Sequence, residues 1–435
     1  MKKRHIFSKT VFLSALLIFV FGINCGAEIS KPRSHWPEIS LAKESKEIIF
    51  NPAISNGQII EEIVKANNSF GLAIYRELCS EKGNHFLSPL SLSIALSMAL
   101  EGAKGKTAEV MIRVLNLPED ASLRRSGFME MQKLINQPGR KSELRLANAI
   151  WIQKNFEILK SYVDVISTIY GGQATNVDFL NQREQARKMI NDWTEEKTAG
   201  KIKDLIPPGI IDDQTRVILT NAIYFRGLWL LPFNPEFTRP EKFYLPDGQE
   251  IEVPMMRLLG DRARFFYMEN EEVQMLEMLY EGRDLSMLIL LPRHKTLTAL
   301  EDKLSAEIIK EWEKNLKEER VDVYLPRFKM ETKYFLKEKL KAMGMGLAFS
   351  SKADFSGING QRDLYIQQVI HQAFVEVNEE GTEAAAATGV LIGRTAYIPE
   401  KRYVFRADHP FIFMIKEKTS GSILFLGRLY DPRSG

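Results

Sequence analysis

The sequence predicts an α+β fold in one large domain, and three observations support this prediction. Helical spacing of apolar residues dominates the first half of the 435-residue chain, whereas strand-like apolar runs dominate the second half. Helices and strands therefore fall in separate blocks instead of alternating regularly, which is typical of α+β proteins. From about residue 60 onward, no Gly/Ser-rich linker, internal repeat or low-complexity segment marks a domain boundary.

Residues 1–27 have the pattern of a secretory signal peptide. A basic start is followed by an apolar run at 11–23, which is too short for a membrane span, and by small residues up to Ala27. Lipoprotein anchoring through Cys25 is the alternative, although Asn24 is larger than that processing usually accepts. We expect cleavage after Ala27 and secretion, to the periplasm if the source is bacterial. The formal charge then falls from +3 to −1, because the removed segment has four basic and no acidic residues.

Residues 28–59 contain several Pro, Ser and Lys residues and show little periodicity, so we expect an exposed, poorly ordered leader there and a single domain at 60–435. Apolar spacing predicts helices at 60–78, 91–100 and 184–197. Strand-like runs occupy 216–226, 285–291, 320–325, 372–378 and 423–428. If Cys25 leaves with the signal peptide, only Cys79 remains and the fold must rely on its core without an intramolecular disulfide.

No catalytic or metal-binding motif is found in the sequence. The six His residues are scattered and form no zinc pattern, and neither a GxSxG motif nor a P-loop occurs. Acidic pairs fall on charged helical faces, which are typical of a solvated surface. The near-neutral mature charge gives no reason to expect a nucleic-acid partner. These absences argue against an enzyme and against a cofactor, although catalytic triads are recognised by geometry and not by sequence position.

One segment near the C-terminus is the most informative part of the chain. Its residues are Glu379, Glu380, Gly381, Thr382, Glu383, Ala384, Ala385, Ala386, Ala387 and Thr388. If the segment forms a strand of period two, one face carries only small uncharged side chains and the other carries Glu383. Such a strand could slide between two existing strands with its small side chains against the core, and Gly381 would supply the hinge. A plain Ala-rich surface loop or helix is the alternative.

Further motifs accompany this hinge in a fixed order. They are 86–91, 100–107, 221–229, 253–256, 325–328, 353–358, 408–411 and 425–428. Each could arise by chance, but the ordered set over roughly residues 60–431 resembles the serpin family of serine protease inhibitors. The resemblance implies helices packed around three β-sheets, a five-stranded central sheet, and an exposed reactive-centre loop at about 379–400.

The resemblance also implies a single-use inhibitor and not an enzyme. A protease attacks the loop and forms an acyl-enzyme, and insertion of the loop into the central sheet then traps a covalent 1:1 complex. Ser88, Ser91, Asn221 and His371 would line the gate, or shutter, through which the loop enters. Trp229 would lie in the breach at the top of the sheet. A satisfied core histidine is the alternative for His371 alone, and a large core aromatic for Trp229.

Two positions for the reactive bond stay open. Arg394-Thr395 suits the acidic pocket of a trypsin-like protease, and its surroundings resemble the bait of antithrombin. The usual family spacing from Gly381 gives Thr395-Ala396 instead, which would suit an elastase-like or subtilisin-like enzyme. Tyr397 gives a third option, a chymotrypsin-like enzyme. We favour Arg394-Thr395 and a serine protease, and a cysteine protease stays open as a partner.

Other interpretations concern partners and modification. Five basic residues in a predicted helical region are diluted by apolar residues, so we expect a solvated face and no heparin-like polyanion site; they are Arg124, Arg125, Lys133, Arg140 and Lys141. Asn67-Asn68-Ser69 is a glycosylation acceptor if the source glycosylates, or otherwise a helix start. We expect a monomer. A non-inhibitory carrier or chaperone of the same fold is the rival function, and the intact hinge argues against it.

Overall fold

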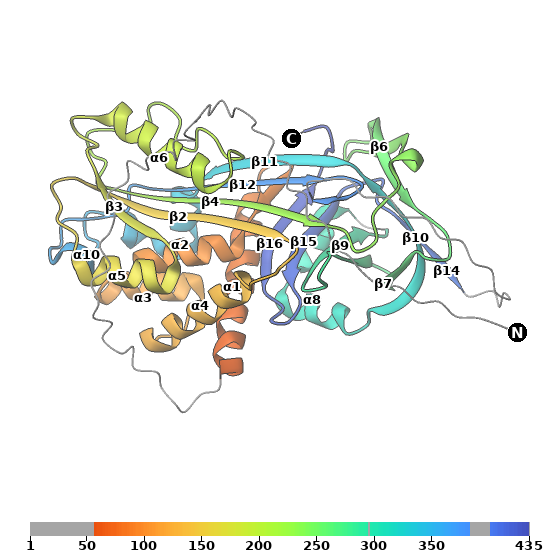
Figure 1. Ribbon diagram of the computed structural model, residues 1–435, viewed down its shortest axis with the longest axis horizontal. Helices are drawn as coiled ribbons and strands as arrows, with labels where there is room; N and C mark the ends of the chain where they lie inside the picture. Colours follow the sequence, from red (N-terminus) through yellow and green to blue (C-terminus); the bar gives the residue numbers. More distant parts are fainter. Residues whose placement is uncertain (1–55, 295, 383–400, 435) are drawn as a thin grey trace, which may run out of the picture. The chain divides into compact units, whose positions relative to one another are not determined.

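The structure confirms an α+β arrangement in which helices dominate the first part of the chain and strands the later part (Figure 1). The computed structural model describes residues 56–294, 296–382 and 401–434, which all lie in one compact unit. The longer helices are α1 (Asn56–Cys79), α2 (Pro89–Gly102), α3 (Gly105–Leu115), α4 (Ala121–Ile135), α5 (Lys160–Tyr170), α6 (Arg183–Lys197), α7 (Leu297–Lys303) and α8 (Ala306–Glu313). Short helical turns are η1 (Pro235–Phe237), α9 (Lys337–Leu340), η2 (Lys341–Met345), η3 (Gly346–Phe349) and α10 (Ser356–Asn359).

Helix α2 is the central helix of the core. The Ser88 side chain accepts a hydrogen bond from the Ser91 backbone N–H at 3.1 Å, and Pro89 occupies the first helical position, so the sequence specifies where the helix begins. Nearly every residue of α2 is buried. The helix packs against β2 (Glu143–Gln153) and β4 (Val217–Leu228) of one sheet and against β16 (Ile423–Leu429) of the other. Helix α2 therefore links the two sheets through the core.

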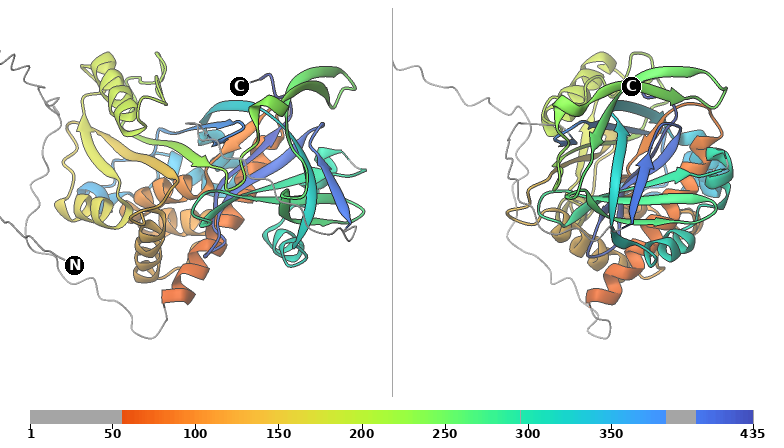
Figure 2. Two further views of the ribbon diagram at one scale, coloured as in Figure 1. Left: turned by 45° about the vertical axis from the view of Figure 1, so that its right-hand side comes forward. Right: turned by 90° about the vertical axis from the view of Figure 1, so that its right-hand side faces the viewer.

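The central sheet contains the strands that position the candidate site. Its order is β11 (Phe328–Phe335), β12 (Gln368–Val377), β13 (Gly381–Thr382), β4 (Val217–Leu228), β2 (Glu143–Gln153) and β3 (Gln173–Val177). Five strands are long, as the resemblance implies, and the sixth, β13, has only two residues. Helix α6 covers the face of this sheet that is turned away from α1–α5, a placement visible in Figures 1 and 2. Trp193 of α6 meets Trp151 of β2 edge to face at 5.3 Å.

The remaining strands form one continuous sheet, which differs from the expected total of three sheets. Its order is β1 (His85–Leu87), β16 (Ile423–Leu429), β15 (Phe411–Glu417), β9 (Leu285–Pro292), β8 (Val273–Leu279), β7 (Arg264–Glu269), β10 (Lys317–Pro326), β6 (Glu250–Leu258) and β5 (Arg239–Tyr244), with β14 (Arg402–Arg406) beside β10. The physical reason is that β10 pairs with β7 at one end, 317–320, and with β6 at the other, 323–326. One long strand thus joins what would otherwise be two sheets.

Two local expectations differ from the structure. Helix α1 begins at Asn56, so residues 56–59 belong to a helix and not to the leader. Asn67 lies in the middle of α1 and is 2% exposed, and its amide donates to the Ile423 carbonyl at 3.0 Å. It is therefore neither a helix start nor an accessible glycosylation acceptor in the folded chain. The signal peptide at 1–27 and the leader up to residue 55 lie outside the described residues.

Among the described residues, no helix is both long and apolar enough to cross a membrane.

Candidate functional site

The hinge begins as a short additional strand at the end of the central sheet where β4 and β12 finish. After β12 the chain turns at residues 378–381, where the Asn378 N–H donates to the Gly381 carbonyl at 2.9 Å. Gly381 and Thr382 then lie between β12 and β4 and run antiparallel to both strands. Below them β12 and β4 pair directly with each other, over 368–374 and 218–224. Strand β13 thus occupies two residues between β12 and β4, and these two strands pair directly with each other over the rest of the seam.

Gly381 is required by a close approach of two backbones. A Cβ atom at this position would lie 2.1 Å from the Gly227 carbonyl oxygen and 2.6 Å from the Leu228 Cα. Both are backbone atoms of β4, so they cannot move aside as a side chain would. Any larger residue would separate β13 from β4, and the sequence at 381 is therefore fixed by packing.

Thr382 faces the core and has a specific partner. Its side chain is fully buried, and its hydroxyl lies 2.9 Å from the hydroxyl of Tyr280. Burial raises the pKa of the Tyr280 phenol, so this group remains a neutral hydrogen-bonding hydroxyl. A charged side chain at 382 would have to be buried against the Tyr280 side chain.

Trp229 closes the same end of the sheet. It is 2% exposed, stacks on Tyr280 at 4.6 Å between ring centroids, and donates from its indole Nε1 to the Asn378 carbonyl at 3.0 Å. Its backbone N–H also donates to the Glu380 carbonyl at 2.8 Å. Trp229 is therefore both a core aromatic and a direct contact of the hinge turn, so the two interpretations of this residue are compatible.

Glu379 anchors the turn to the neighbouring strands. Its carboxylate accepts hydrogen bonds from the Arg327 guanidinium, one of them 3.1 Å long, and from the Thr238 hydroxyl at 2.6 Å. Burial raises the pKa of this carboxyl, but the bonds from Arg327 and Thr238 lower it further than burial raises it, so Glu379 stays ionised. The partly buried Glu380 contributes mainly through its backbone.

The four predicted shutter residues come together in one buried polar cluster. Ser88 is the residue before α2, Ser91 lies in α2, Asn221 in β4 and His371 in β12, and all four are fully buried. The His371 Nε2 accepts from the Ser88 backbone N–H at 3.1 Å, and its Nδ1 bonds to the Asn221 side-chain oxygen. This pattern requires the neutral tautomer with the proton on Nδ1. Burial lowers the pKa of His371 to about 3, so the neutral form persists at physiological pH.

Sequence reasoning missed a fifth member of this cluster, Asn148 of β2. The Ser91 hydroxyl donates to its side-chain oxygen at 3.2 Å, and the Asn221 amide donates both to that oxygen and to Ser91. The available signal was a polar residue within the apolar run from 146 to 152. No comparable signal marks Tyr280, Arg327 or Thr238, because their hinge partners lie 52 to 141 residues away in the sequence.

Several predicted residues lie outside the described part of the chain. These are Glu383–Thr388 of the hinge and the reactive-bond candidates Arg394, Thr395 and Ala396. From Lys401 the chain leads into β14, which pairs in parallel with β10. The loop therefore connects the upper end of the central sheet to the second sheet.

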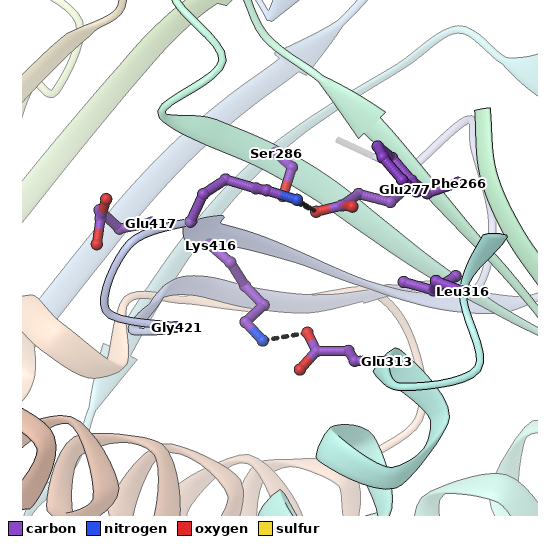
Figure 3. A pocket seen from close by; sticks show the side chains of 9 residues that line it. Phe266, Glu277, Ser286, Glu313, Leu316, Lys416, Glu417 and Gly421 are labelled. Carbon is purple, nitrogen blue, oxygen red and sulfur yellow. Dashed lines mark hydrogen bonds and ion pairs between the residues drawn. The ribbon is translucent and has the colours of Figure 1, made fainter. Parts of the chain in front are cut away.

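A charged hollow and the thiol of Cys79 are the next candidates, and their charged or reactive groups have internal partners. A hollow of about 320 Å³ lies beside β8, β9 and β15, and ion pairs cross it from Lys416 to Glu313 and from Lys418 to Glu277, the latter at 2.6 Å (Figure 3). The Cys79 thiol contacts Glu301, and burial followed by that carboxylate raises its pKa to about 12, which makes it unreactive. No group of His, Cys, Asp or Glu suited to a metal ion occurs in the part of the chain that the structure describes.

Four of the five basic residues considered for a polyanion bind other groups of the chain. Arg124 donates to the Pro118 carbonyl at 2.7 Å, and the other contacts are Arg125–Glu101 at 2.6 Å, Lys133–Glu130 at 2.5 Å and Arg140–Asp284 at 2.7 Å. Lys141 is exposed. Four of these residues are thus engaged within the chain, and the expectation of a solvated face without a polyanion stays a prediction.

Comparison with known proteins supports the family resemblance. A family model described as Serpin (serine protease inhibitor) matches residues 65–432. A serpin-like protein of Thermococcus kodakarensis is 41% identical over 434 residues, which cover 98% of this chain and 100% of that protein. The leukocyte elastase inhibitor of Bos taurus is 41% identical over 382 residues, which cover 86% of this chain and 100% of the inhibitor. The crystal structure of Serpin48 from the insect Tenebrio molitor has 37% identity and a TM-score of 0.76, covering 85% of this chain and 98% of that one.

Proposed function

The chain belongs to the serpin family, and from this premise we propose that it is a secreted inhibitor of serine proteases that acts by loop insertion. It is not expected to be an enzyme, because its relatives include proteins named as protease inhibitors. The observation that carries the proposal is the position of β13. Its two residues already occupy the top of a sixth-strand site between β12 and β4, and the sequence that follows contains small residues able to continue there.

In the proposed mechanism, the protease serine attacks the carbonyl carbon of the reactive bond. An ester forms between enzyme and loop, the peptide C–N bond breaks, and the leaving amine becomes the new N-terminus of the C-terminal segment, which contains β14, β15 and β16 of the second sheet. The freed loop then extends β13 downward between β12 and β4. Serpin loop insertion is an established example of strand addition, in which main-chain hydrogen bonds supply the driving force. The attached protease would be carried with the loop before water can hydrolyse the ester.

The hinge chemistry favours an insertion-competent chain. The inward face of the hinge starts with the buried Thr382, and by period two it continues with Ala384 and Ala386, which are small and uncharged. An unpaired charge on that face would cost about 2 kcal/mol or more to bury. We propose Arg394-Thr395 as the reactive bond and a trypsin-like enzyme as the target. Thr395-Ala396 with an elastase-like target is the alternative.

A carrier function is less well supported. The hollow beside β8, β9 and β15 is half open and is crossed by the ion pairs of Lys416 and Lys418. A small apolar ligand would have to displace these charged groups, which would then lose their partners. No specific feature of the hollow offers compensation for that loss.

The test is incubation of the protein with trypsin and, separately, with elastase, followed by denaturing electrophoresis and mass analysis of the released C-terminal peptide. We expect a denaturant-resistant 1:1 complex and a peptide that begins at Thr395. A peptide that begins at Ala396 would assign the alternative bond. Clean cleavage in the loop, with no complex and no gain in thermal stability, would refute inhibition by insertion.

A further inference from the structure

A hydrogen bond joins β11 to the connection that leads into β4, whose seam with β12 the proposed insertion must open. The Lys333 ammonium of β11 donates to the backbone carbonyl of Asp204 at 2.6 Å. Lys333 lies opposite Gln372 of β12, and the adjacent Tyr334 stacks on His371 of the inner polar cluster. Because side chains alternate along a strand, Lys333 points to the opposite, outer face of the sheet.

The acceptor belongs to the other side of the seam. Asp204 lies in the connection 198–216, which leads from α6 into β4. This connection is bound to α6: the Asn191 side chain accepts from the Ile206 N–H at 2.8 Å and donates to its carbonyl at 3.0 Å. Arg187 of α6 donates to the same carbonyl at 3.1 Å. Asp204 is therefore held to α6, which packs on β2, and its connection continues into β4, whereas Lys333 belongs to β11, which pairs with β12.

The connection is also held in a fixed conformation. Ile202, Leu205 and Ile206 are fully buried, so the segment is packed on the molecule on both sides of Asp204. Asp204 has a φ of 47°, in the left-handed region that few residues other than glycine adopt. Such conformations persist where surrounding contacts impose them, and here the contacts on both sides of Asp204 do so.

The role that these contacts suggest for Lys333 rests on the proposed function. We propose that Lys333 is a positioning residue that holds the seam between β4 and β12 closed until the loop is cleaved. A strand added at the seam moves β12 away from β4 by about 4.8 Å. A hydrogen bond of 2.6 Å across the seam does not survive that movement unless the connection leaves its buried position. Lys333 thus stabilises the uncleaved form selectively and slows its spontaneous insertion.

The test compares two lysines of the same strand and face. Lys333→Met removes the donor and keeps the aliphatic stem. Lys329→Met is the matched control, because Lys329 lies over the Phe374 ring of β12 at 5.2 Å and so contacts a residue on its own side of the seam. Uncleaved proteins are held at an elevated temperature, and conversion to a urea-resistant inserted form is followed on urea-gradient gels. The thermal midpoints of the loop-cleaved proteins are measured in parallel.

We expect Lys333→Met to convert about fivefold faster than wild type, the loss of one hydrogen bond worth about 1 kcal/mol, while Lys329→Met converts at the wild-type rate. Lys333→Arg, which keeps a donor, should restore most of the delay. The cleaved Lys333→Met protein should match cleaved wild type, because the bond is absent from the inserted form. Equal conversion of the two Met variants, or equal destabilisation of cleaved and uncleaved Lys333→Met, would overturn the role of Lys333. A wild-type chain that gains no stability on cleavage would instead overturn the proposed function and this inference with it.

Discussion

If the chain inhibits by loop insertion as proposed, a charge placed at Thr382 should convert it from an inhibitor into a substrate. Thr382 is fully buried, and its hydroxyl contacts Tyr280 at 2.9 Å. In Thr382→Arg, the guanidinium must either leave the sheet, which withdraws β13, or be buried beside an aromatic ring without a counter-charge. An unpaired buried charge costs about 3 kcal/mol or more, even after the surroundings relax. Since every 1.4 kcal/mol changes a rate tenfold, insertion should slow by about 100-fold.

Hydrolysis of the acyl-enzyme competes with insertion, and the substitution leaves the reactive bond and the protease unchanged. A wild-type chain that traps about ten proteases for each one that escapes would therefore become a variant that traps about one in ten. The assay is the molar ratio of chain to trypsin or elastase needed for full inhibition, together with the share of cleaved chain on denaturing gels. Thr382→Ser keeps a small hydroxyl and serves as the control. A Thr382→Arg variant with wild-type stoichiometry would refute insertion at this position.

Three further predictions concern His371 of the buried polar cluster, Glu379 of the hinge turn and Arg394 of the proposed reactive bond. His371 is neutral in the fold, with a pKa of about 3 against about 6.5 in the unfolded chain. Its contribution to the free energy of unfolding is therefore complete above pH 6.5 and declines as the pH falls toward 3. Thermal unfolding at pH 7 and at pH 5 should reveal a loss of about 2 kcal/mol, which His371→Gln should abolish. Glu379→Gln weakens the bond to Arg327, and because that arginine is half exposed we expect a loss of only about 1 kcal/mol, measured as a thermal midpoint lower by a few degrees. Arg394→Ala should abolish the complex with trypsin and leave any complex with elastase; an unchanged trypsin complex would exclude Arg394 as the primary residue.

Local sequence patterns predicted the elements but not the pairings between them. The Ser88-Pro89 start gave the position of α2 to within two residues, because capping is a local effect. The start of α1 was missed by four residues, since Asn56 and Gly57 are typical of loops. The joining of the second sheet through β10 was also missed, because it depends on strand partners about 60 residues away in sequence. The apolar pattern of one strand does not show which distant strand it pairs with or in which register.

Parts of the candidate site that depend on the size of one residue could be predicted from the sequence. Parts that depend on a partner far away in the sequence were harder to predict. Glycine at 381 was expected from its place in the hinge, and the contact with Gly227 gives the physical reason for it. The local motif at Asn67 predicts a glycosylation acceptor or a helix start, but the Asn67 amide donates to a carbonyl 356 residues further along the chain. The ionised Glu379 likewise depends on Arg327 and Thr238, which nothing in the hinge sequence specifies.

The polar cluster below the hinge divides along the seam between β4 and β12. Asn148, Asn221 and Ser91 bond to one another from β2, β4 and α2, so opening the seam leaves their mutual bonds intact. His371 of β12 reaches them through the Asn221 oxygen and accepts from the N–H of Ser88. Moving β12 therefore disturbs at most these two bonds, and an inserted strand brings new backbone donors and acceptors to the same place. Because an unpartnered buried polar group costs about 1–3 kcal/mol, this division keeps the side-chain cost of opening small compared with that of the backbone ladder. On this reasoning His371 acts as the releasable member of the cluster, and Asn148 holds the half that remains together.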